Sequence, residues 1–161
     1  MDNEPIDFDR IWKHLSQQFL LGIRSIHGPS HWRRVETFGL KIAEINGADP
    51  TVVRLFAVFH DSRRENENWD PAHGKRGAEL AETLRGRFFE LDDGRLETLV
   101  HACTYHADGL IHDDPTIGAC WDADRLDLPR VGMIPDPRLL CTAAAKEKSM
   151  RRWAMDYERH R

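Results

Sequence analysis

Histidine and aspartate residues recur along this chain in an order that could hold a metal ion. In sequence order they are His31, the adjacent pair His60 and Asp61, His73, His106 and Asp124. Imidazoles and carboxylates, without cysteine, hold hard to borderline divalent cations at sites that keep coordination positions open. Each of these residues lies beside apolar residues when its segment is read as a helix, and such polar side chains do not enter a core unpaired. The pattern therefore predicts a metal site inside a helical bundle, of a kind that does chemistry.

Helical phase decides between neighbouring candidates, because residues three, four and seven apart share one face of a helix. His106 continues the apolar stripe of its segment, whereas His101 falls on nearly the opposite face. Asp124 likewise continues an apolar stripe, and Asp122 lies off it. We therefore expect His106 and Asp124 to point inward.

The adjacent His-Asp pair is a weak signal by itself, since the chain contains nine histidines and short motifs arise by chance. His112 and Asp113 form a second copy, but that copy lies in a polar stretch with no apolar segment before it. His60 and Asp61 end a strongly apolar segment and are followed closely by two arginines. This context favours the first pair as the functional one.

The elements that must position these residues are helices. No convincing period-two strand, internal repeat or low-complexity tract is visible. Gly, Pro and Asp punctuation divides the chain into amphipathic segments, which predict helices at residues 7–24, 30–46, 51–60, 75–85, 94–106, 115–128 and from 137 to the C-terminus. We predict an all-α, single-domain bundle of about six to seven helices over residues 1–161, with a motif-bearing core at about 27–128 and flanking helices at 1–25 and 137–161.

Two polar segments, residues 62–74 and 108–114, are predicted to be loops. The first is long for a compact domain, and loops of that length are often functional. The apolar first and last helices could cover the core or form a homodimer contact.

Composition narrows the class of protein. The 161 residues suit one domain with a substantial core, and 31% charged residues is ordinary for a globular protein. The formal charge is −4 and the basic residues are scattered, so we expect no nucleic-acid polymer as partner. The acidic N-terminus lacks an apolar signal region and no stretch is long enough to span a membrane, so we expect a cytoplasmic protein. Three widely spaced cysteines are expected to be reduced.

The motifs and their order resemble the HD superfamily of metal-dependent phosphohydrolases. Residues 31–35, His-Trp-Arg-Arg-Val, look like that family's H-x-x-R-V helix start. Residues 55–61 look like its apolar helix ending in His-Asp, and residues 122–127, Asp-Ala-Asp-Arg-Leu-Asp, look like its closing helix. The resemblance covers about residues 27–128. The Gly-Tyr-Pro signature of the cyclic-dinucleotide phosphodiesterase branch is absent, so the chain looks closest to small stand-alone HD proteins.

The resemblance implies a set of metal ligands. The residues that would hold one divalent metal are His31, His60, Asp61 and Asp124. Asp61 would be able to bridge to a second metal, and His73 and His106 fall where some branches of the superfamily have additional ligands. One or two divalent cations per chain are therefore implied. The ligand types leave Fe, Mn, Co, Ni, Zn and Mg open.

The activity implied is hydrolysis of a small phosphorylated substrate, a phosphomonoester or a nucleotide. A divalent metal helps by lowering the pKa of its bound water towards about 7 and by neutralising charge. The catalytic set would join Asp61 to Arg34, Arg63 and Arg64, since guanidinium groups form bidentate forks with phosphoryl oxygens. Another carboxylate should orient the imidazoles. Asp122 and Asp127 are both candidates for that role.

Two alternatives use the same residues. An HD-type di-iron oxygenase would need the same His/Asp set, and the arginines beside the His-Asp pair favour hydrolysis over it only mildly. A non-catalytic nucleotide-binding regulatory module is disfavoured, because loss of catalysis usually shows as a missing ligand and the set is complete.

Overall fold

The computed structural model describes residues 4–157, and every regular element in that range is helical. The elements are α1 (Phe8–Gln18), α2 (Pro29–Asn46), α3 (Pro50–Phe59), α4 (His73–Leu84), α5 (Asp93–Tyr105), α6 (Pro115–Arg125), α7 (Ala143–Lys146) and α8 (Lys148–Asp156), with 3₁₀ turns at Leu128–Val131 and Pro137–Leu139. The predicted all-α class is confirmed. The described α-helices number eight rather than six or seven, because the C-terminal part of the chain is divided into short pieces.

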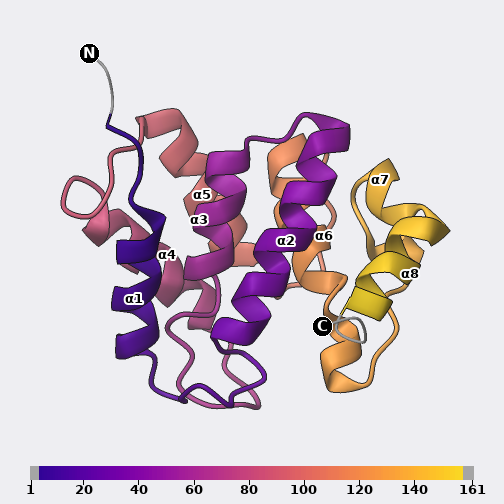
Figure 1. The fold of residues 1–161 in the computed structure, drawn as a ribbon, viewed down its shortest axis with the longest axis horizontal. Coiled ribbons are helices and arrows are strands. Elements are labelled where there is room, and N and C mark those ends of the chain that lie inside the picture. Colours follow the sequence, from indigo (N-terminus) through magenta and orange to yellow (C-terminus); the bar gives the residue numbers. More distant parts are fainter. Residues whose placement is uncertain (1–3, 158–161) are drawn as a thin grey trace.

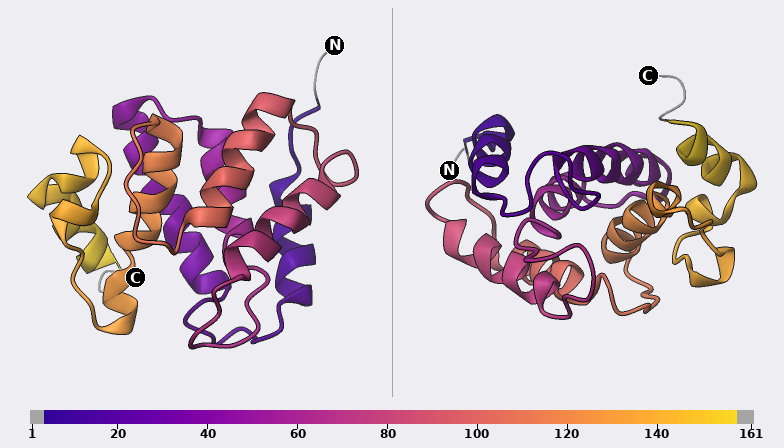
Figure 2. Two further views of the ribbon diagram at one scale, coloured as in Figure 1. Left: turned by 180° about the vertical axis from the view of Figure 1, so that it is seen from behind. Right: turned by 90° about the horizontal axis from the view of Figure 1, so that it is seen from below.

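The apolar helix α3 lies at the centre of the bundle. All of its residues from Val52 to Phe59 are buried except Arg54, and it contacts α1, α2, α4, α5 and α6. Asp49 starts this helix by accepting hydrogen bonds from the backbone amides of Thr51 and Val52, and Pro50 occupies its first position. Figures 1 and 2 show α2 alongside α3, with α1 and α4 on one flank and α7 and α8 on the other.

The first helix is shorter than predicted. It ends at Gln18, and the chain then turns at Phe19, whose backbone is extended, and at Gly22, which has a φ of +82°. Ile23, expected on the apolar stripe, is 82% exposed. The extended backbone of Phe19 ends the helix. The apolar spacing continues past that residue, so the spacing alone predicts a helix that is too long.

The prediction of one long helix from residue 137 to the C-terminus is wrong. Asp122, buried on α6, accepts hydrogen bonds from the backbone amides of Cys141 and Thr142 and from the Thr142 hydroxyl. These bonds hold the chain extended just before α7, and Glu147 breaks it again before α8. The last predicted helical residues, 158–161, lie outside the described residues.

Two glycines let α4 lie against its neighbours at very short distance. A Cβ atom on Gly74 would lie 2.4 Å from the backbone oxygen of Cys103 in α5, and one on Gly77 would lie 2.4 Å from that of Phe59 in α3. Neither position tolerates a side chain without displacement. The close approach places the start of α4 beside the ends of α3 and α5.

The ends of the motif-bearing helices lie together at one end of the bundle. α2 and α4 begin there, α3 and α6 end there, and the loops after α1 and α3 lie together at the lower edge of Figure 1.

Among residues 4–157, no helix combines the length and the apolar character needed to cross a membrane.

Candidate metal centre

The six His and Asp residues singled out in the sequence lie at helix ends. His31 is in the first turn of α2 and His73 is the first residue of α4, while the others stand in the last turn of a helix or directly after it. Their nitrogen and oxygen atoms form three overlapping groups, and within each group all atoms lie within 4.8 Å of one another. The groups are His31–His60–Asp61, His60–His106–Asp124 and Asp61–His73–His106. The structure thus brings all six residues into one buried cluster.

The four imidazoles of this cluster are oriented by hydrogen bonds on their outer sides. His31 donates from Nδ1 to the Asp127 carboxylate, at 2.7 Å. The other three donate from Nδ1 to a backbone carbonyl, and these pairs are His60 with Ala57, His73 with Asp70, and His106 with Cys103. Each Nδ1 therefore carries a proton, and each Nε2 faces the interior of the cluster. Imidazoles that ligate metals are fixed in this way.

Asp61 lies between two pairs of imidazoles. Its Oδ2 atom is 3.4 Å from Nε2 of His31 and 3.5 Å from Nε2 of His60. Its Oδ1 atom is 3.2 Å from Nε2 of His73 and 3.3 Å from Nε2 of His106. One carboxylate oxygen thus serves each pair, and Asp124 Oδ1 joins the first pair at 3.0 Å from His31.

The cluster requires positive charge at its centre. The Nε2 atoms of His31 and His60 are 3.1 Å apart, and those of His73 and His106 are 3.0 Å apart. Two unprotonated nitrogens at such distances repel each other, so a proton or a cation must lie between them. Burial lowers the pKa of His31, but hydrogen bonds to Asp124, Asp127 and Asp61 outweigh it and raise the pKa to about 10. A divalent cation would satisfy the same need, and the donor set fits one.

The two carboxylates remain anionic in this environment. Burial raises the pKa of Asp61, but the charge of His60 and hydrogen bonds from the surrounding imidazoles lower it well below its ordinary value. The pKa of Asp124 is likewise raised by burial and lowered further by His31 and His60. Asp124 is the most exposed of the six, with 17% of its side chain accessible. Solvent therefore reaches the cluster from the Asp124 side.

The structure separates the two candidates for the orienting carboxylate. Asp127 holds His31 through Oδ2 and accepts a hydrogen bond from Nε of Arg34 through Oδ1, both at 2.7 Å. Asp122 instead binds the chain before α7. Asp127 is therefore the residue that fixes an imidazole of the cluster.

The three arginines expected to bind phosphate occupy different surroundings. Arg34 is buried and donates to Asp127 and to the Ser30 hydroxyl. Arg64 is also buried, and its Nη1 lies 3.2 Å from each ring nitrogen of His73. Arg63 is exposed. Arg34 and Arg64 thus support residues of the cluster, and phosphate binding by all three stays a prediction.

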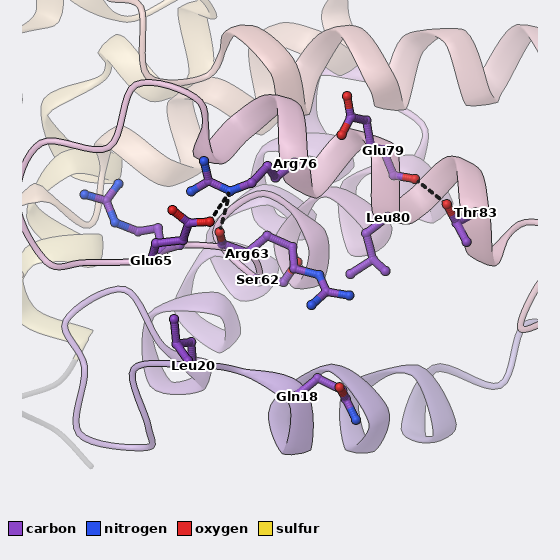
Figure 3. Close-up of a pocket in the computed structure, with 10 residues that line it drawn as sticks. Gln18, Leu20, Ser62, Arg63, Glu65, Arg76, Glu79, Leu80 and Thr83 are labelled. Carbon is purple, nitrogen blue, oxygen red and sulfur yellow. Dashed lines mark hydrogen bonds and ion pairs between the residues drawn. The ribbon is translucent and has the colours of Figure 1, made fainter.

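Arg63 projects into a surface hollow of about 480 Å³ between the end of α1, the chain after Asp61 and α4. Figure 3 shows its side chain extending between Leu80 and Gln18, while Arg76 binds its backbone oxygen. The six clustered residues do not line this hollow. Its lining includes Arg64, which contacts His73, so the hollow adjoins the cluster without reaching it.

One residue next to the cluster, His27, was not indicated by any motif in the sequence. His27 lies just before α2, and its Nδ1 is 3.4 Å from Asp61 Oδ2. It belongs to residues 26–29, Ile-His-Gly-Pro, between the helices predicted at 7–24 and 30–46. The signal that could have found His27 is its place at the entry of the helix that carries His31.

Two comparisons with known proteins match the chain, one by family and one by fold. A profile of the family described as HD domain matches residues 30–147. No curated protein matches the chain. A crystal structure from an uncultured Thermotogales bacterium, described as a predicted HD superfamily hydrolase, is similar with a TM-score of 0.72 and 24% sequence identity, over 94% of this chain and 87% of that one. At that identity, the likeness concerns the fold.

Proposed function

The chain belongs to the HD-domain family, and from that premise we propose that it is a divalent-metal-dependent hydrolase of a small phosphate ester, a phosphomonoester or a nucleotide. The observation that carries the proposal is the placement of Asp61, whose two oxygens each face a pair of inward-pointing Nε2 atoms at 3.2–3.5 Å. A carboxylate between two imidazole pairs is the arrangement that two metals sharing one ligand would need.

The donors divide into two sets around this carboxylate. His31, His60 and Asp124 lie on its Oδ2 side, and His73 and His106 lie on its Oδ1 side. This division supports a dinuclear centre. When bound, divalent cations supply a nucleophile by lowering the pKa of coordinated water to about 7, and they neutralise charge on the phosphoryl group.

The chain's own residues prepare that chemistry before any substrate arrives. Asp127 keeps one proton of His31 on Nδ1, so that Nε2 is the ring atom available to bind a metal. Asp61 and Asp124 are anionic, because their pKa values lie well below the ordinary value. Apart from Asp124, the clustered side chains are almost fully buried, and electrostatic interactions are stronger in such surroundings.

Among the arginines, Arg64 is the best placed to act near the reacting group, since its guanidinium already touches the ring of His73. Arg34 would act through Asp127, which it holds in place. Arg63 would meet only a part of the substrate that reaches the surface hollow.

The proposal is tested with protein purified without chelator or metal-affinity resin. Metal content is measured first, and phosphate release is then measured from a panel of phosphomonoesters and nucleotides with Mn, Co, Ni or Mg. We expect turnover with at least one metal, and its loss in Asp61→Ala together with the metal. The control His112→Ala alters the second His-Asp pair, which lies outside the cluster, and should keep both metal and activity.

Three outcomes contradict the proposal. A fully loaded protein that releases no phosphate from any substrate would not be a phosphohydrolase. Bound iron together with oxygen-dependent loss of a substrate would identify a di-iron oxygenase. Tight nucleotide binding without turnover would identify a regulatory module.

A further inference from the structure

We infer that His27 is an additional ligand of the metal centre, and that its Nδ1 donates to the cation on the Oδ2 side of Asp61. The inference rests on the proposed metal-dependent function. It extends the predicted set of six residues by one that no motif of the chain points to.

The position of the His27 ring is the first observation. Nδ1 lies 3.4 Å from Asp61 Oδ2, the oxygen that also faces His31 and His60. This nitrogen is buried, yet it makes no hydrogen bond with any of the described residues. Buried polar atoms are nearly always satisfied. An unsatisfied nitrogen that faces a group of metal-ligating atoms therefore points to a partner that the polypeptide itself does not supply.

The opposite ring nitrogen gives the second observation. Nε2 of His27 lies 3.3 Å from the backbone oxygen of Glu67. A carbonyl oxygen only accepts, so Nε2 carries a proton and faces away from the cluster, while Nδ1 faces the Asp61 carboxylate. A cation between Nδ1 and that carboxylate would give both atoms a partner. His27 thus repeats the pattern of the other four imidazoles, with a proton facing outward and a donor atom facing inward.

Hydrogen bonds on both sides of His27 fix the stretch of chain that carries its ring. The Ser25 hydroxyl and the Ile26 amide donate to the Glu67 carboxylate, which joins the loop after α1 to the loop after α3. The indole of Trp32 donates to the backbone oxygen of His27 at 2.7 Å. A ligand fixed in advance loses little entropy when the metal binds. These contacts make His27 a preorganised donor.

The inference is tested by titrating metal-free protein with Co²⁺ and following the visible absorption bands of the bound ion. X-ray absorption at the cobalt edge then counts the imidazoles. We expect His27→Ala to bind one Co²⁺ at least about tenfold more weakly and to show one imidazole fewer per chain. The matched control His101→Ala removes a histidine that stacks on Trp121, outside the cluster, and should bind as the wild type does.

A purely structural role for His27 is separated by rescue. Free imidazole added to His27→Ala should restore the affinity and the cobalt spectrum, because it can occupy the position of the lost ring. If His27→Ala keeps wild-type affinity and imidazole count, or if imidazole restores neither, His27 is not a ligand, and the proposed function stands. If the wild-type protein binds no Co²⁺, both proposals are wrong.

Discussion

Replacing Asp127 by asparagine tests how much of the metal affinity depends on a residue outside the ligand set. Asp127 accepts one hydrogen bond on each oxygen, from Nδ1 of His31 and from Nε of Arg34, both at 2.7 Å. Asparagine has one acceptor oxygen and one amide that only donates. If the amide faces Arg34, two donors meet in a buried space. If it faces His31, it drives the proton of His31 from Nδ1 to Nε2, the atom that must bind the metal.

Either orientation weakens the centre. Removing an outer partner of a metal-ligating histidine typically costs 10–100-fold in metal affinity, which is about 1.4–2.7 kcal/mol of binding free energy. We expect Asp127→Asn to fall in this range when Mn²⁺ or Co²⁺ is titrated in competition with a chelator of known affinity.

Asp122→Asn is the matched control. Asp122 is also buried and lies on α6, just before Asp127 in the chain, but its oxygens accept from the amides of Cys141 and Thr142 rather than from the cluster. Its replacement should lower the free energy of unfolding by about 1–3 kcal/mol and leave the metal affinity unchanged. Wild-type metal affinity in Asp127→Asn, or equal losses of affinity in both variants, would refute the reasoning.

Three further predictions concern the cluster and its supports. Asp61→Ala should remove bound metal altogether, since both imidazole pairs lose their shared carboxylate; full metal content by elemental analysis would contradict the assignment of the site. The pKa of His31 is raised to about 10 from 6.5, so its contribution to metal-free stability is complete below about pH 6.5 and is lost as the pH rises towards 10. Chemical unfolding at a series of pH values should show that fall without metal and not with it. Gly74→Ala should destabilise the protein by about 1–3 kcal/mol, because its Cβ would meet the Cys103 oxygen at 2.4 Å. Gly94→Ala, at the same position of α5, meets only the Asp92 side chain at 3.5 Å and should be neutral or slightly stabilising; equal thermal shifts for the two variants would rule out the steric explanation.

Much of the fold could be predicted because the chain marks most helix starts with capping residues. Asp49 and Pro50 begin α3, and Asp114 and Pro115 begin α6, where sequence reasoning placed them. The end of α1 could not be found in this way. Apolar spacing continues through Ile23, and only the packed structure shows that this residue faces solvent.

The C-terminal helices were mispredicted for a different reason. Their break is caused by Asp122, which lies 19 positions before Cys141 in the chain. A hydrogen bond over such a separation leaves no local pattern in the sequence.

The residues of the candidate site likewise divide into those that a local pattern indicates and those that only long-range contacts indicate. His106 and Asp124 could be chosen over their neighbours from helical phase alone, whereas the choice of Asp127 over Asp122 depended on contacts between distant segments.

The clustered side chains also have a consequence for how the protein would unfold. They belong to five separate stretches of chain, and contacts such as His31 to His60 and His106 to Asp61 close loops of 29 and 45 residues. A cation held there would act as a cross-link that ties these stretches at one point, and such a tie restricts the unfolded chain more as the closed loops lengthen. Unfolding would then have to wait for the ion to leave. The lifetime of the native state would follow the rate of metal release, and a chelator would shorten it without touching a single packing contact.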